Sequence, residues 1–130
     1  MTACVADTHA LVWYLTGSRR LGRSAAEVFE MPDARIVIPT IVLAELKYLH
    51  QRSRIPLSLS VVERLIAADE RCLVFPMTEE VVRLLPVELD IHDAIICATA
   101  LAHSRATGLE TAVLTRDQAI VRSGLVPVLW

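Results

Sequence analysis

The sequence has little lysine and no excess of positive charge. Its 13 basic residues are 12 arginines and Lys47, against 15 acidic residues, so the net charge at pH 7 is −2. Proteins that bind nucleic acid mainly through charge carry a strong basic patch. A phosphate-bearing substrate would therefore need a local group of arginines or a bound cation.

Cysteine is also scarce. Cys4, Cys72 and Cys97 are odd in number and far apart, and each stands among apolar neighbours. Free cysteine in such surroundings is usually a core residue, so we expect three buried thiols. No Cys/His spacing is typical of a zinc site.

Long hydrophobic runs are absent. The apolar stretches at 36–46 and 94–102 are broken by Pro39 and Glu45 or fall short of the roughly 18 residues that span a membrane. No basic segment precedes the first apolar run, so we expect no signal peptide, no membrane contact and a cytoplasmic protein. A hydrophobic fraction of 54% in 130 residues excludes general disorder and predicts one domain over 1–130.

Short apolar segments alternate with helix-like segments along the chain. The expected strands are 3–6, 35–38, 72–75, 111–114 and 126–129. The expected helices are 9–15, 24–31, 40–51, 61–70, 78–85 and 90–106, with a short one after Asp117. Continuous apolar strands between helices indicate a parallel sheet covered on both faces. We therefore predict an α/β chain with a three-layer α/β/α fold and a four- to five-stranded parallel sheet.

Hydroxyl side chains stand where several of these helices should begin. Ser24 and Thr40 are candidate N-caps, either Ser58 or Ser60 can cap the fourth helix, and Thr78 the fifth.

Two acidic residues follow predicted strands. Asp7 comes directly after the first strand, and Asp117 lies three residues beyond Leu114. Ligands of parallel sheets gather beyond the carboxyl ends of the strands, where both residues should lie. Taken singly, each aspartate is also adequately explained as a turn or N-cap residue.

Glu45 lies within an apolar helix pattern. Ile41 and Leu49 stand four residues away on either side, and Val42 and Tyr48 flank the same side. This stripe should face the core. A glutamate there is costly unless it is paired or bound to a metal. The alternative is that Glu45 lies at the solvated border of the stripe.

Asp93 begins the apolar face of the longest predicted helix. Ile96, Cys97 and Ala100 follow it at helical spacing. Asp90 stands three residues earlier, which leaves a simpler interpretation open: Asp90 as the N-cap, with Asp93 at the third helical position of a capping box.

The four acids together suggest a metal centre. Carboxylate oxygens are preferred ligands of Mg²⁺ and Mn²⁺, whereas clustered carboxylates without a cation repel one another. Such centres suit phosphoryl chemistry, because a cation activates water and neutralises charge on phosphorus. The residues alone predict an acidic metal site, and a hydrolase as its activity.

Four segments resemble, in order, the acidic motifs of PIN-domain ribonucleases, specifically VapC-type toxins of type II toxin–antitoxin systems. They are VADTHALVW at 5–13, IPTIVLAEL at 38–46, HDAIICATAL at 92–101 and VLTRD at 113–117. The ending VLW at 128–130 also fits one VapC subgroup. The resemblance covers nearly the whole chain.

The resemblance implies an α/β/α PIN fold and Mg²⁺- or Mn²⁺-dependent cleavage of RNA that leaves 5′-phosphate ends. Asp7 and Asp93 would be direct metal ligands, and Glu45 and Asp117 would complete the site through water or a second cation. The supporting residues would be Thr8 and Thr115, which orient carboxylates, and Asp90, which keeps the family's acidic spacing.

One position departs from the VapC subgroup, because Ala94 stands where many members have arginine. This difference concerns substrate contacts rather than the metal site. Candidate RNA-contacting residues are Arg19, Arg20, Arg23, Arg52, Arg54 and Arg116. Arg116 is the strongest of them because it adjoins Asp117.

The family further implies a homodimer and a VapB-type antitoxin partner. An alternative function stays open: a catalytically silent PIN module that binds RNA or a partner and co-represses its operon with an antitoxin. A P-loop is not favoured, because Arg23 replaces the lysine of that motif and no clear strand enters it.

Overall fold

The computed structural model describes residues 2–130 and contains a five-stranded sheet. The strands are β1 (Ala3–Ala6), β2 (Arg35–Pro39), β3 (Cys72–Phe75), β4 (Thr111–Leu114) and β5 (Val128–Leu129). Their order across the sheet is β3-β2-β1-β4-β5, and every neighbouring pair is parallel. The predicted parallel sheet is confirmed, at the upper end of the expected strand number.

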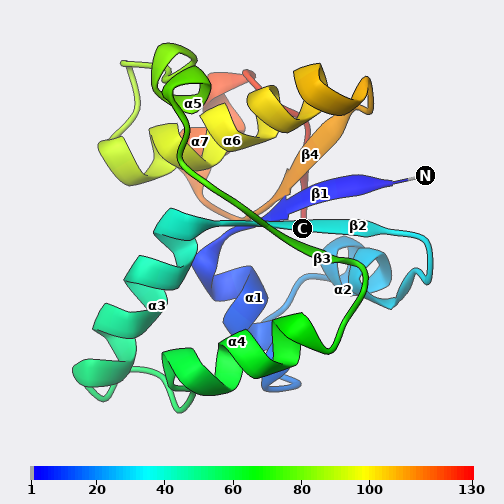
Figure 1. The fold of residues 1–130 in the computed structure, drawn as a ribbon, viewed down its shortest axis with the longest axis vertical. Coiled ribbons are helices and arrows are strands. Elements are labelled where there is room, and N and C mark those ends of the chain that lie inside the picture. Colours follow the sequence, from blue (N-terminus) through cyan, green and yellow to red (C-terminus); the bar gives the residue numbers. More distant parts are fainter. Residues whose placement is uncertain (1) are drawn as a thin grey trace.

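Helices cover both faces of this sheet. They are α1 (Thr8–Leu15), α2 (Arg23–Glu30), α3 (Thr40–Gln51), α4 (Leu59–Ala67), α5 (Glu79–Arg83), α6 (Ile91–Thr107) and α7 (Gln118–Ser123). Figure 1 shows α1 to α4 on one side of the sheet and α5, α6 and α7 on the other. The three-layer α/β/α prediction is therefore confirmed. Among the described residues, no helix combines the length and apolar character needed to cross a membrane.

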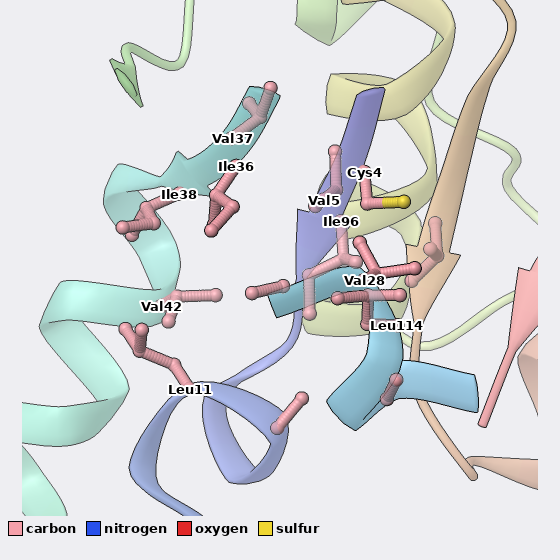
Figure 2. Close-up of a cluster of buried hydrophobic side chains, with 14 of the residues drawn as sticks. Cys4, Val5, Leu11, Val28, Ile36, Val37, Ile38, Val42, Ile96 and Leu114 are labelled. Carbon is pink, nitrogen blue, oxygen red and sulfur yellow. The ribbon is translucent and has the colours of Figure 1, made fainter. Parts of the chain in front are cut away.

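The core lies on both sides of the central strands. All four residues of β1 and all four of β4 are buried, as expected of apolar strands covered on both faces. Figure 2 shows buried side chains of the strands, such as Val5 and Ile36, which face opposite sides of the sheet, together with buried side chains of the helices. Edge strand β3 differs, because Leu73 is 37% exposed.

Side-chain caps explain where several helices begin. The Asp7 carboxylate accepts a hydrogen bond of 2.8 Å from the Ala10 backbone nitrogen at the start of α1. Ser58 caps α4 and Thr78 caps α5, each by accepting from a backbone nitrogen at 3.3 Å. Of the two candidates for α4, Ser58 is thus the cap.

Two expected caps are wrong. Gly22 holds the N-cap position of α2, so Ser24 lies inside the helix. Pro39 holds the N-cap position of α3, which makes Thr40 the first helical residue. Neither helix has a side-chain cap, because glycine and proline carry no side-chain oxygen that could accept a hydrogen bond.

The three cysteines are all free. Cys4 and Cys97 are buried as expected, whereas Cys72 on edge strand β3 is only partly buried. Burial raises the pKa of the Cys4 thiol to about 11, so it is protonated at neutral pH and unsuited to nucleophilic chemistry.

Candidate functional site

The carboxyl ends of the neighbouring strands β1 and β4 lie side by side. From β1 the chain continues to β2 and β3 on one side, while β4 and β5 lie on the other. The point where strand order reverses is the usual ligand-binding crevice of an open parallel sheet. Asp7 follows β1, Asp117 follows β4, and the Asp7 backbone nitrogen donates to the Leu114 carbonyl at 3.3 Å. The structure therefore places both aspartates at this crevice.

Two helices bring the other acids. Glu45 lies in the middle of α3, and Asp93 lies in the first turn of α6. Helix α3 packs against both α1 and α6. The four predicted acids thus come from four separate segments.

The pKa of Asp7 is raised, and burial is the main cause. The Thr115 hydroxyl, the Ala10 backbone N–H and His9 act in the opposite direction, since each favours the ionised carboxylate. Asp117 adds to the rise by repulsion. The aspartates after β1 and β4 are therefore close enough to repel each other.

The pKa of Asp93 is also raised, first by burial and then by repulsion from Asp117, Asp90 and Asp7, while His92 opposes the rise. Asp93 is thus electrostatically coupled to three other carboxylates. Mutual repulsion of this kind is the property that a bound cation relieves.

Glu45 joins the same group. Burial is the main cause of its raised pKa, and Asp7 and Asp93 contribute by repulsion. His92 and the Thr8 hydroxyl favour its ionised form; His92 Nδ1 lies 3.7 Å from Glu45 Oε1.

Two buried polar atoms in this region lack partners. Among the described residues, two buried polar side-chain atoms have no hydrogen bond of acceptable geometry: Thr8 Oγ1 and Glu45 Oε1. Leaving such atoms unsatisfied is costly, so their presence at a carboxylate group fits an oxygen-binding ligand such as a hard cation. Within residues 2–130, however, no three His, Cys, Asp or Glu side chains are close enough to hold a metal ion. The carboxylate oxygens are the kind of ligand that Mg²⁺ or Mn²⁺ prefers. In this structure, however, the described carboxylates are too far apart for three of them to hold one ion.

Asp7 and Asp117 have structural roles as well. Both are N-caps, and Asp117 accepts from the backbone nitrogens of Ala119 and Ile120 at 2.9 and 3.2 Å. Asp117 makes both bonds through Oδ1. The simple interpretation of these two residues as caps is therefore correct, and it leaves Oδ2 of Asp117 outside both cap bonds.

Asp90 occupies the N-cap position of α6 but makes no side-chain cap bond. The capping-box interpretation of Asp90 and Asp93 is wrong in this respect. The exposed Asp90 carboxylate instead raises the pKa of Asp93.

The buried stripe of α3 is narrower than expected. Its buried residues are Val42 and Leu46, whereas Tyr48 is 62% exposed. Glu45 therefore lies at the border of the core, with its side chain 27% exposed. A helix turns 100° per residue, so a stripe centred on Val42 and Leu46 leaves Glu45 beside it.

A cavity of about 580 Å³ opens beside Asp7 and Asp117. The other residues that line it are His9, Trp13, Arg20, Leu49, Arg54, Ile55, Arg116 and Trp130. Three of the predicted RNA-contacting arginines therefore share one cavity with two of the acids. Arg19 lies outside the lining, and Arg23 pairs with Glu27 at 3.2 Å on the exposed face of α2.

A second hollow of about 510 Å³ lies next to Glu45 and His92. Its other walls are formed by His9, Ile41, Ala44, Tyr48 and Leu49. The remaining candidate, Arg52, lies outside both linings and stacks on Tyr48, with its Cζ 4.7 Å from the ring centroid.

Sequence reasoning missed the aromatic wall of the first cavity. Trp13 and Trp130 both line the cavity, and their ring centroids lie 5.7 Å apart. His9, at 5.4 Å from the Trp13 ring, completes the wall. The sequence feature that could have indicated this wall is His9, which stands two residues after Asp7.

Several solved structures share this fold. A chain in the VapBC2 structure of Rickettsia felis, bound to a DNA fragment from its promoter, has 17% identity and a TM-score of 0.67, with 98% of each chain covered. A chain in a toxin–antitoxin complex from Klebsiella pneumoniae has 22% identity and a TM-score of 0.62, covering 98% of this chain and 96% of the other. VapBC-1 from nontypeable Haemophilus influenzae has 16% identity and a TM-score of 0.65, covering 98% and 97%.

No curated protein matches the chain in sequence. The model of the PIN domain family, in contrast, matches residues 4–124. This match spans all four acidic segments, strands β2, β3 and β4, and β1 from Cys4 onward. Together with the parallel sheet and its acidic edge, it establishes that the chain belongs to the PIN domain family.

Proposed function

We propose that this protein is a metal-dependent endoribonuclease and the toxin of a type II toxin–antitoxin pair. One observation carries the proposal: in a PIN domain, the pKa values of Asp7, Glu45 and Asp93 are each raised by burial and by repulsion from neighbouring carboxylates. Carboxylates arranged at such a cost to stability are typical of functional sites. PIN domains are generally nucleases, which gives the reaction class.

Asp7 and Asp93 would hold Mg²⁺ or Mn²⁺ directly, with Glu45 and Asp117 completing the site. A divalent cation bound there supplies an activated water and neutralises negative charge on the phosphate. The unpartnered Oε1 of Glu45 supports this assignment, because a hard cation or its water would satisfy that atom.

The other residues of the site position these groups. The Thr115 hydroxyl accepts a hydrogen bond from the Asp117 backbone nitrogen at 3.0 Å and favours the ionised form of Asp7. Thr8 favours the ionised form of Glu45. Asp90 strengthens the negative field at Asp93. Arg20, Arg54 and Arg116 supply the local positive charge that the whole chain lacks.

The partners follow from the same comparison. Chains of similar fold occur in toxin–antitoxin complexes, which supports a VapB-type antitoxin as the binding partner here. We also propose a homodimer acting in the cytoplasm, because RNA is found there and PIN toxins of this type are commonly dimeric.

Cleavage of labelled total RNA tests the proposal. The purified protein, freed of any antitoxin, is incubated with Mg²⁺ or Mn²⁺, with EDTA, and as the Asp93→Asn variant. We expect cleavage only in the wild type with metal. An inactive but folded wild type would instead support the silent PIN module, and cleavage that survives in Asp93→Asn would reject the proposed site.

A further inference from the structure

The sheet ends on one side in a strand whose outer edge is unpaired. Strand β3 pairs with β2 alone, and among the described residues no strand lies beyond it. The Ile36 backbone nitrogen donates to the Arg71 carbonyl, so the alternation of a parallel ladder directs the N–H and C=O of Val74 away from β2. Outward-directed backbone groups of this kind are a template for one further strand.

The side chains of β3 do not protect this edge. Natural edge strands are usually protected by charged residues, proline or a bulge. Strand β3 has the sequence CLVF, which contains no charge and no proline, and Leu73 and Val74 are 37% and 38% exposed. The strand at the opposite edge, β5, is only two residues long. Of the two edges of the sheet, β3 is therefore the one that suits an added strand.

A hollow of about 450 Å³ lies beside this edge, and its walls come mainly from β3 and α4. Figure 1 shows α4 beside β3, and the two elements are in contact. The hollow shares no lining residue with the two hollows near the acids. Apolar side chains of an added strand would be buried here. The apolar residues that line the hollow are Leu43, Ile66, Ala67, Cys72, Leu73 and Val74.

The rim of this hollow is acidic. Glu63, Asp69 and Glu70 line it, and within the described part of the chain no lysine or arginine does. Asp69 is neutralised by Arg71, whose Nη2 lies 2.8 Å from Asp69 Oδ2. Among residues 2–130, neither Glu63 nor Glu70 takes part in an ion pair. A segment that fills the hollow would therefore gain from positive charge beside its apolar side chains.

We propose that the edge of β3 binds an extended, basic segment of a partner protein as a sixth strand of the sheet. Apolar side chains on one face of that segment enter the hollow, and lysine or arginine side chains beside them pair with Glu63 and Glu70. A second copy of the chain fits less well, because a two-fold contact would place this acidic rim against itself. Pro76, directly after β3, has no N–H and limits the added strand to a few residues. The proposal does not depend on the ribonuclease function.

A short labelled peptide tests charge and backbone pairing together. The peptide KKVTVTVKK places its valines on one face of a strand and lysines at both ends. EEVTVTVEE reverses the charge, and the central proline of KKVTPTVKK disrupts strand pairing. Binding to the full-length protein is measured by fluorescence anisotropy. We expect saturable binding of KKVTVTVKK and affinity about tenfold or more lower for the other two peptides.

Hydrogen exchange measured by NMR locates the bound peptide. The Val74 amide should exchange about tenfold or more slowly with saturating KKVTVTVKK than without it, because the added strand accepts its hydrogen bond. The Val113 amide is the internal control. It already donates to the Pro127 carbonyl at 2.8 Å and should exchange at the same rate in both states.

Reversing the rim charge should reverse the peptide preference. The double variant Glu63→Lys, Glu70→Lys should bind EEVTVTVEE about tenfold or more tightly than KKVTVTVKK. Both residues are exposed, so the fold should tolerate the change. The matched control is the double variant Glu88→Lys, Glu110→Lys. It makes the same charge change at two exposed acids outside the hollow and should keep the preference of the wild type.

Several results would overturn the proposal. They are the absence of saturable binding, equal affinity for KKVTVTVKK and KKVTPTVKK, unchanged exchange at Val74, or an unchanged preference in the variant of Glu63 and Glu70. A Val74 amide that is already protected in the peptide-free dimer would assign the edge to a second copy instead. RNA cleavage is measured separately, so neither result decides the other.

Discussion

The Thr115 hydroxyl oxygen accepts a hydrogen bond of 3.0 Å from the backbone nitrogen of Asp117. The same buried hydroxyl favours the ionised form of Asp7 on the neighbouring strand end. One side chain thus links the carboxylates that follow β1 and β4. Its oxygen fixes the turn that carries one acid, while its proton is available to the other.

This link predicts the effect of Thr115→Val. Valine has a similar shape but no hydroxyl, so the Asp117 turn loses its acceptor and Asp7 loses a group that favours ionisation. Loss of a partner that orients a metal-binding carboxylate typically reduces activity or metal affinity by about 10- to 100-fold. We expect that reduction in metal-dependent RNA cleavage. Thr115→Ser retains the hydroxyl and should stay within a few-fold of the wild type; equal activity of all three proteins would refute the role.

Asp93→Asn should stabilise the protein when metal is absent. The folded-state pKa of Asp93 lies above its usual 3.8, so the folded state holds the proton more tightly than the unfolded state. Stability from this residue is therefore present at low pH and falls as pH rises from 3.8 through the raised pKa. Asparagine has no charge to repel Asp7 and Asp117. At pH 7 in EDTA, the Tm of Asp93→Asn should therefore exceed that of the wild type.

Addition of Mg²⁺ should reverse that order. A cation bound by the carboxylates stabilises the wild type by mass action and has less effect on Asp93→Asn. The measurement is thermal unfolding with EDTA and with millimolar Mg²⁺. A lower Tm of the variant in EDTA would show that Asp93 is stabilising without metal, contrary to the expectation.

Gly22→Ala should disturb Trp130. A Cβ at Gly22 would lie 2.5 Å from Cδ1 and 2.7 Å from Cγ of the Trp130 ring, and it would also meet the Trp130 backbone. Such overpacking costs about 1–3 kcal/mol in unfolding free energy. We expect that loss in urea unfolding, together with a changed tryptophan emission spectrum. Ser24→Ala, on the same helix but without a capping bond, should change neither quantity appreciably.

His103 predicts a loss of stability in acid. This residue is 2% exposed, and its Nδ1 lies 2.8 Å from Thr111 Oγ1. Burial, followed by the charge of Arg35, lowers its pKa below 6.5. At pH values between the two pKa values, His103 is protonated in the unfolded state but not in the folded state. Stability should fall as pH drops below about 6.5, with a slope of at most about 1.4 kcal/mol per pH unit.

Urea unfolding at a series of pH values checks this contribution. The slope should be smaller in His103→Gln than in the wild type, since glutamine can still bond to Thr111 but does not titrate. The acids of the site contribute equally to both proteins, so the difference isolates His103. Parallel pH profiles would assign the acid sensitivity to other groups.

Strand positions and order of acids could be predicted from the sequence because they depend on local patterns. Buried strands such as 111–114 are continuous apolar runs, and the acids stand at their ends or on apolar helices. Helix starts were less predictable. Ser58 caps its helix but Ser24 does not, because α2 begins one residue before Ser24 and places Gly22 at the N-cap position.

The cavity could not be predicted because its walls meet only in three dimensions. Arg20, Arg54 and Arg116 are separated by 34 and 62 positions, and each alone resembles an ordinary surface charge. The stacking of Arg116 on Trp13 depends on the pairing of β1 with β4. The apolar pattern of either strand does not indicate that β1 and β4 pair with each other.

The central place of β1 in the sheet has a consequence for how the protein comes to be made. Ala3 pairs with Thr111, a partner 108 positions later in the chain. Closing so long a loop is slow, and it cannot begin until the later strand has been synthesised. A growing chain therefore carries Asp7 and Glu45 well before Asp117 exists, and its acidic edge is incomplete throughout that period. The topology itself delays the assembly of the site until nearly all of the domain has been translated.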